Sequence, residues 1–85
     1  MITILPSNKL IQSKIQKYSL QKKFEKQIKL LAKSPLHPSL NAALLSPKEY
    51  GIYSFRIDIK FRALYIFHKK LNAIEIINIT VHYHP

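Results

Sequence analysis

The chain has 85 residues, enough for one small domain and too few for two. A hydrophobic fraction of 47%, with five tyrosines and four phenylalanines, is typical of a folded globule and excludes a disordered basic tail. Fourteen Lys and Arg against four Asp and Glu give a formal net charge of +10. We therefore expect a polyanionic partner, either nucleic acid, anionic lipid or an acidic protein, although a chain that is simply basic is the alternative.

The sequence has no cysteine, which excludes disulfides, thiolate metal sites and thiol nucleophiles and fits a reducing compartment. The apolar run at residues 1–5 stops at Pro6 and is too short for a signal peptide, and no run approaches the length of a membrane span. We expect a cytoplasmic protein with no membrane contact and a single domain over residues 1–85.

The first half of the chain has helical periodicity after a short β-prone run at residues 1–5. Ser7 or Asn8 can cap a first helix of about ten residues, with an apolar stripe at Ile11, Ile15 and Tyr18. Ser19 can cap a second, with its stripe at Leu20, Phe24, Ile28 and Leu31. Four lysines recur at helical spacing on another face of this second helix: Lys22, Lys26, Lys29 and Lys33. They form either an RNA-facing or partner-facing surface or a solvated face.

The second half is β-like. Prolines punctuate residues 34–48, which we interpret as a loop from helix to sheet. Runs rich in Ile, Tyr, Phe and Val follow at roughly 52–58, 61–68 and 74–82, with a turn at 69–72. The predicted fold is α+β: a short N-terminal strand, two helices and a three-stranded antiparallel meander, with the helices on one face of the sheet.

Alternation along these runs places polar side chains on one side of each strand. In the last run it groups Ile76 with Asn78, Thr80 and His82, and places Ile77, Ile79, Val81 and Tyr83 opposite. If the polar sides coincide, one set meets on the face that the helices leave open: Arg56, Arg62, Asn78, Thr80 and His82.

This set of side chains has the chemistry for RNA cleavage without a metal. Arg56 and Arg62 can clamp a phosphodiester while its 2′-hydroxyl attacks it. His82 or Tyr83 can serve as acid or base. The alternatives are arginines paired with Asp58 or Glu75 at the sheet surface, and a His82 with no task.

Other sites have little support in the sequence. His82 and His84 could bind a metal, but no Cys, Asp or Glu near the end of the chain completes a site. A single glycine excludes a Gly-rich phosphate loop, and the four scattered acidic residues do not make a magnesium site. We expect neither a metal nor another cofactor.

Four segments together resemble the RelE/ParE toxin superfamily: Ser34–Leu40 after a basic helix, Gly51–Asp58, Lys60–Tyr65 and a last strand ending in Thr80–Tyr83. The resemblance covers nearly the whole chain and implies a RelE-like, microbial RNase-like fold. It also implies a toxin whose acidic antitoxin wraps it and masks the active face.

The resemblance also assigns roles to residues. Arg62, in a Phe-Arg-x-x-Tyr pattern, matches the arginine that contacts the scissile phosphate, and Arg56 matches a basic residue on the preceding strand. His82 matches a basic or histidine position at the end of the last strand. Many members continue beyond it to a catalytic tyrosine, whereas this sequence ends at Pro85. Tyr83 is expected to stand in, which requires a twist or bulge at the strand end.

Members of the RelE-like branch cleave messenger RNA in the ribosomal A site, and members of the ParE-like branch inhibit DNA gyrase. His82 favours the first activity, a metal-independent, ribosome-dependent endoribonuclease whose RNA-binding residues are Lys22, Lys26, Lys29, Lys33, Lys48 and Lys60. The expected partners are the ribosome, mRNA and an acidic antitoxin in a hetero-oligomer. The alternatives are a gyrase inhibitor and an inactive antitoxin-binding or nucleic-acid-binding member.

Overall fold

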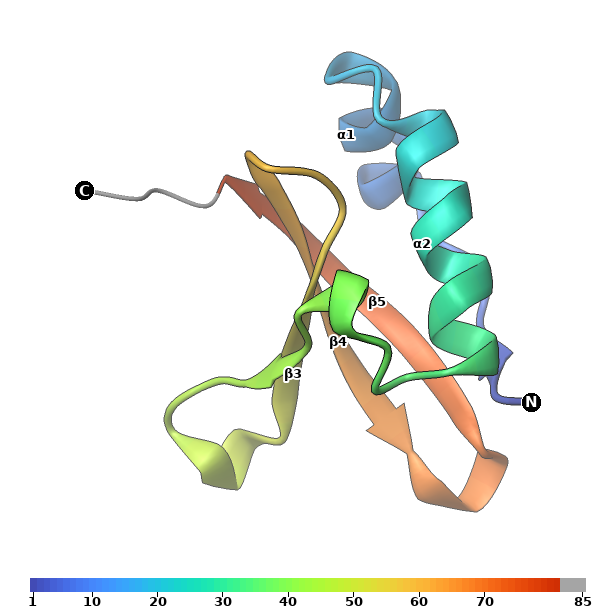
Figure 1. The fold of residues 1–85 in the computed structure, drawn as a ribbon, viewed down its shortest axis with the longest axis vertical. Coiled ribbons are helices and arrows are strands. Elements are labelled where there is room, and N and C mark those ends of the chain that lie inside the picture. The colour runs from blue at the N-terminus through green and yellow to red at the C-terminus, as the bar shows by residue number, and fades with distance from the viewer. Residues whose placement is uncertain (82–85) are drawn as a thin grey trace.

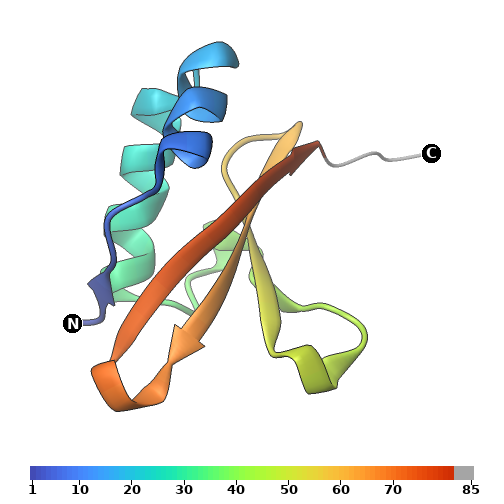
Figure 2. The ribbon, with the colours of Figure 1, turned by 180° about the vertical axis from the view of Figure 1, so that it is seen from behind.

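A computed structural model describes residues 1–81 and shows two helices on one face of a single sheet (Figures 1 and 2). The strands are β1 (Thr3–Ile4), β2 (Ala43–Leu44), β3 (Ile52–Arg56), β4 (Phe61–His68) and β5 (Ala73–Val81). The helices are α1 (Lys9–Lys17) and α2 (Gln21–Lys33), with 3₁₀ turns at Pro38–Leu40, Lys48–Tyr50 and Lys69–Leu71. The α+β architecture predicted from the sequence is confirmed.

The sheet has five strands in the order β1-β5-β4-β3-β2. Strands β3, β4 and β5 are the predicted antiparallel meander. Strand β1 pairs with β5 in parallel, and β2 pairs antiparallel with β3, placing Ala43 opposite Ser54. The prediction of a loop throughout residues 34–48 is therefore wrong at β2. A strand of only two residues is too short to show the alternation by which a strand is recognised in a sequence.

The two helices begin and end differently from each other. Asn8 caps α1 as predicted, because its side-chain oxygen accepts a hydrogen bond of 2.9 Å from the N–H of Ile11. The prediction that Ser19 caps α2 is wrong: Leu20 holds that position without a side-chain bond. Ser19 instead adopts a left-handed conformation with φ of 54°, which reverses the chain between the helices.

No helix within residues 1–81 is long and apolar enough to cross a membrane.

The core lies between the helices and the inner face of the sheet. Its buried apolar side chains include Ile11, Ile15, Leu20, Phe24 and Leu31 from the helical half, and Phe55, Ala63, Ile74, Ile76 and Ile79 from the strands. Burial of these side chains supplies the main stabilisation of the fold. Tyr18, predicted to complete the first stripe, is 40% exposed, and its ring centroid lies 4.8 Å from that of Phe61.

A bulge in β5 changes which side chains share a face. Tyr65 pairs with Ile76 but Leu64 pairs with Asn78, so Ile77 is an extra residue on β5. Ile76 and Ile79 are both buried against the helices, at 3% and 4% exposure. The prediction that grouped Ile76 with Asn78 is therefore wrong, because strict alternation does not hold across a bulge.

Gln27 joins α2 to the end of β3. It is only 8% exposed, and its side-chain nitrogen donates to the carbonyl of Arg56 at 2.7 Å and to that of Ser39 at 3.2 Å. A buried amide between two carbonyls fixes the distance between helix and strand. Gln27 thereby holds the backbone of Arg56.

Gln27→Met keeps the approximate volume of the side chain but removes both donors. We expect its free energy of unfolding to fall by about 1–2 kcal/mol, because two carbonyls lose their partner. Urea unfolding followed by circular dichroism measures the change. Gln21→Met, on the exposed start of α2, is the matched control and should stay within about 0.5 kcal/mol of the parent. Equal effects of the two substitutions would contradict the assigned role.

Asp58 shapes the turn between β3 and β4. Its carboxylate accepts from the N–H groups of Lys60 and Phe61, both at 2.8 Å, and from the ammonium of Lys23 at 3.2 Å. Burial by itself favours the neutral acid, but the two backbone bonds and Lys23 outweigh it and hold the pKa of Asp58 below its ordinary value of 3.8.

Because the pKa of Asp58 is lower in the folded chain, its ionised form stabilises the fold. That contribution is complete above about pH 4, the ordinary carboxyl range, and is lost as the pH falls through the folded pKa. Asp58→Asn should therefore cost about 1 kcal/mol at pH 7 and progressively less in acid. Urea unfolding of both proteins across this range tests the prediction, and a pH-independent difference contradicts it. Lys23→Gln, which removes only the exposed ion pair, should cost less than about 0.5 kcal/mol.

Candidate functional site

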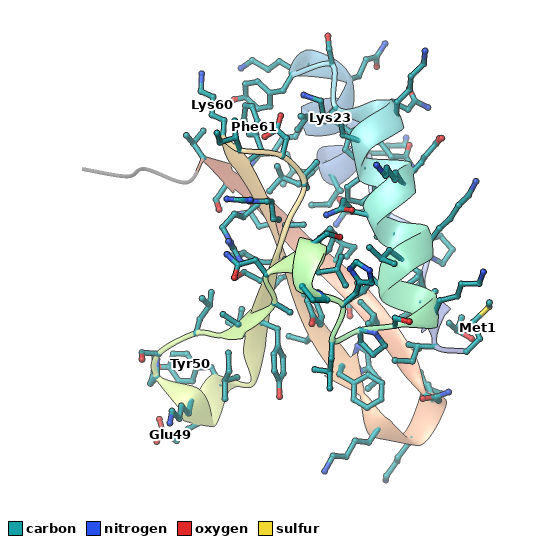
Figure 3. All side chains as sticks on the ribbon, viewed as in Figure 1. Met1, Lys23, Glu49, Tyr50, Lys60 and Phe61 are labelled. Carbon is teal, nitrogen blue, oxygen red and sulfur yellow. The ribbon has the colours of Figure 1, made fainter. Side chains whose placement is uncertain are left out.

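Arg56 and Arg62 are directly opposite each other across β3 and β4. Residues opposite each other in an antiparallel pair share a face of the sheet. Ser54, Leu64 and Thr80 belong to the same face by their pairing, and the helices cover the other one. The pair is the last of the β3–β4 ladder, next to the hairpin end at which Figure 3 labels Lys60 and Phe61. The predicted convergence of the two arginines on the open face is what the structure has.

Arg62 is held firmly in place although it is charged and only 8% exposed. Its Nε and Nη2 donate to the hydroxyl oxygen of Ser54 at 3.2 and 2.9 Å, and Nη2 also donates to the carbonyl of Asn41 at 2.6 Å. Within residues 1–81 its Nη1 makes no such bond, and no buried side-chain nitrogen in that range lacks a partner.

The two guanidiniums form a positive pair that no carboxylate of residues 1–81 neutralises. Asp58 is bonded to Lys23, and Glu75 lies 2.9 Å from a ring nitrogen of His68. The alternative of arginines paired with Asp58 or Glu75 is therefore wrong. Burial first, and then the nearby charge of Arg56, lower the pKa of Arg62 from its ordinary value. An anion bound between the two arginines would relieve this repulsion.

A hollow of about 320 Å³ opens on this face beside Arg62. Its walls are Asn41, Ala43, Leu45, Ser54, Arg62, Leu64 and Thr80. None of these side chains is acidic, so the hollow presents a cation, hydroxyl groups and apolar walls. Such a surface suits a sugar-phosphate ligand, since Arg donates in a fork that matches phosphate oxygens.

The two polar residues of this hollow that were not assigned to the site from the sequence are Ser54 and Asn41. Ser54 carried a signal, because it alternates with Arg56 on the same side of β3. Asn41 carried none, since it acts through its carbonyl from a left-handed position after a 3₁₀ turn.

The predicted acid and base, His82 and Tyr83, lie outside the described residues. The last described residue, Val81, pairs with Phe61, and Thr80 pairs with Arg62. Strand β5 thus brings the chain alongside Arg62 one residue before its last described position. The roles of His82 and Tyr83 remain predictions.

Asn78 also lies on β5 but is engaged from α1. The ammonium of Lys14 donates to its side-chain oxygen at 2.7 Å and to the carbonyl of Ile79 at 3.4 Å. Asn78 additionally accepts from the N–H of Ile79 at 2.9 Å. Its side chain is therefore committed to joining the helix to the strand.

The predicted RNA-binding lysines do not form one surface. Lys22, Lys26, Lys29 and Lys33 are exposed along α2, in the layer opposite the arginine face. Lys60 (Figure 3) lies in the β3–β4 turn close to the arginines. Lys48 lies in the 3₁₀ turn between β2 and β3. Only Lys60 is placed to extend the charge of the arginine pair.

Within residues 1–81 no three His, Asp or Glu side chains gather as a metal site would require.

The chain matches no protein-family model and no curated protein sequence. It is similar to several solved structures. A YoeB/ParE toxin from Agrobacterium tumefaciens superposes with a TM-score of 0.73 at 16% identity, over 96% of this chain and 100% of that one. The heterotetrameric YoeB-YefM toxin-antitoxin complex from Staphylococcus aureus gives 0.67 at 22% identity, over 98% and 97%. A copper-bound mutant toxin from Helicobacter pylori gives 0.73 at 18% identity, over 96% of each chain.

These likenesses agree with the resemblance to the RelE/ParE superfamily and extend over 96–100% of each neighbour's chain. The chain has the fold of the YoeB/ParE toxins.

Proposed function

We propose that this protein is the toxin of a toxin-antitoxin pair and acts as a metal-independent, ribosome-dependent endoribonuclease on mRNA in the cytoplasm. The observation that carries the proposal is the Arg56–Arg62 pair, adjacent on the open face and without a carboxylate partner among residues 1–81. The acidic partner would be its antitoxin, by analogy with the YoeB-YefM complex.

The chemistry follows from where charge develops. The 2′-oxygen of a ribose attacks the adjacent phosphorus, the bond to the 5′-oxygen breaks, and a 2′,3′-cyclic phosphate and a 5′-hydroxyl result. Negative charge grows on the phosphoryl oxygens, where Nη1 of Arg62 and the guanidinium of Arg56 would donate. His82 or Tyr83 would take the proton from the 2′-hydroxyl or give one to the leaving oxygen. DNA lacks the nucleophile and would not react.

Arg56 offers a cleaner test than Arg62. Arg62 bonds Ser54 and Asn41, so its removal also changes the stability of the fold. The side chain of Arg56 is half-buried and makes no hydrogen bond or ion pair to residues 1–81, and Gln27 bonds only its carbonyl.

Arg56→Gln should reduce cleavage of ribosome-bound message by about 10²-fold or more without lowering the free energy of unfolding, because it also removes the repulsion between the two arginines. Primer extension on mRNA from a purified translation reaction measures the cut ends, and urea unfolding checks the fold. Lys70→Gln, in the exposed 3₁₀ turn between β4 and β5, is the matched loss of one charge and should cleave normally. Full activity of Arg56→Gln would remove the arginine pair from the mechanism. Intact message together with loss of DNA supercoiling would identify a gyrase inhibitor instead.

The lysines of α2 are proposed to dock on ribosomal RNA. Each lysine that contacts a phosphate displaces counterions, so the slope of log affinity against log salt falls by about 0.7–0.9 for each one lost. A variant with Lys22, Lys26, Lys29 and Lys33 changed to Gln should therefore bind ribosomes with a visibly shallower slope. Sedimentation with ribosomes at several salt concentrations measures it. An unchanged slope would show that these lysines form only a solvated helix face.

A further inference from the structure

Tyr18 is an aromatic side chain that the fold leaves partly open to solvent. It is the C-terminal cap of α1 and is 40% exposed. Its ring packs against that of Phe61, with centroids 4.8 Å apart and planes tilted by 33°. Phe61 is only 8% exposed, so Tyr18 is the outer ring of the pair. Because a contact of this kind covers one face of a ring, the exposed part of Tyr18 is directed away from Phe61.

Two lysines lie over this pair of rings. The ammonium of Lys17 is 5.5 Å from the centroid of Tyr18, and that of Lys60 is 5.8 Å from the centroid of Phe61. Both lysines are exposed, and neither is ion-paired within residues 1–81. An exposed ring beside ammonium groups is the arrangement of single-stranded nucleic-acid sites, in which bases stack on rings and cations contact phosphates.

The two rings and the two arginines lie at the same end of the β3–β4 hairpin. Arg56 and Arg62 are the last pair of the ladder, and Lys60 and Phe61 directly precede Arg62 in the chain. The turn between α1 and α2, which begins at Tyr18, lies at this end of the molecule in both ribbon views (Figures 1 and 2). A strand that leaves the arginines on the open face therefore passes Lys60 at the hairpin end before it reaches Tyr18.

The chemistry of this site favours an unpaired nucleobase over an acidic peptide. A peptide rich in Asp and Glu offers carboxylates to Lys17 and Lys60 but no flat group for the ring of Tyr18. A single-stranded nucleotide offers a flat base and a phosphate together, whereas the bases of a duplex are already stacked on one another. Lys17 has an exposed, flexible side chain, so its ammonium can move from the ring to a phosphate when a base takes its place.

We propose that Tyr18 stacks on an unpaired base of the RNA strand whose scissile phosphate lies at Arg56 and Arg62, while Lys17 and Lys60 contact the phosphates next to it. The identity of this strand as message rests on the proposed function. Every base has a flat face, so the contact adds affinity without reading the sequence. It fixes the path of the strand round the hairpin end and thereby aligns the scissile phosphate with the arginines.

The test is a fluorescence titration of the protein with a short 2′-O-methyl RNA strand that carries one 2-aminopurine, placed at each position in turn. Such a strand has no free 2′-hydroxyl and is not cut, and stacking of 2-aminopurine on an aromatic ring quenches its fluorescence. Tyr18→Leu, which keeps an apolar side chain on Phe61, should weaken binding about tenfold and abolish the quenching. Tyr18→Phe should keep both.

Tyr50→Leu is the matched control. It removes a ring that is 70% exposed at the other end of the molecule, away from Lys60 and Phe61 (Figure 3), and should bind and quench as the parent does. Urea unfolding checks that the variants fold. If Tyr18→Leu does not fold, the parent protein with a strand of abasic sites decides: binding about tenfold weaker supports the proposal, and equal binding overturns it.

Unchanged affinity and quenching in Tyr18→Leu overturn the proposal. Loss of poly-glutamate binding by the same factor as RNA binding also overturns it, because an acidic protein would then be the ligand of this surface. The strand cannot be cut, so its binding does not depend on endoribonuclease activity. A chain that stacks the base on Tyr18 but cuts no message refutes only the proposed function, and a chain that cuts message without this stacking refutes only the present proposal.

Discussion

The buried guanidinium of Arg62 is the interaction on which the arrangement of the open face depends. A cation that is 8% exposed needs compensation, and none of the four Asp and Glu side chains, all within residues 1–81, supplies it. Neutral oxygens do so instead: the hydroxyl of Ser54 on the neighbouring strand and the carbonyl of Asn41 from the segment before β2. These bonds join β4, β3 and that segment, and they preserve the positive charge that a carboxylate would have cancelled.

The neighbouring cation makes this arrangement costly. Arg56 stands opposite Arg62 at the end of a hairpin, where like charges directly opposite each other destabilise a sheet. The surrounding contacts hold the pair in place. Asp58 closes the turn through the N–H groups of Lys60 and Phe61, and Gln27 fixes the carbonyl of Arg56 from α2. An unfavourable interaction that neighbouring contacts compensate, such as the repulsion between these two guanidiniums, is characteristic of functional sites.

The elements that the sequence predicted well are those with a long periodic signal. The stripes of α1 and α2 and the three β-rich runs define the helices and the meander to within a few residues. The partial misses have local causes. Strand β2 is too short to show a period. Ser19 adopts a left-handed conformation, which serine does not favour. Ile77 is an extra residue that shifts the alternation of β5 by one position. The shared face of Arg56 and Arg62 could be predicted because they lie on β3 and β4, where the alternation of side chains is unbroken. The bulge that breaks the alternation is in β5.

The support around the arginines could not be predicted, because it does not depend on periodicity. The contribution of Asn41 is a backbone carbonyl, and Lys14 reaches Asn78 from a helix 64 positions away in the chain. Contacts of this kind are set by how helices and loops pack against the sheet, which residue spacing does not encode.

The two surfaces of the sheet divide the chemistry of this small domain. Alternation allows a single strand to carry both, since Tyr65 faces an apolar groove on the helix side of the sheet while Leu64, one residue earlier, faces the arginine hollow. A domain of this size has few strands, so two separate surfaces must share them. Ala43 lines both the groove and the hollow, so the edge at β2 is where the surfaces meet. The outer side of this edge is not paired by any strand of residues 1–81. A chain that crosses this edge can therefore reach the arginine hollow without displacing any part of the core.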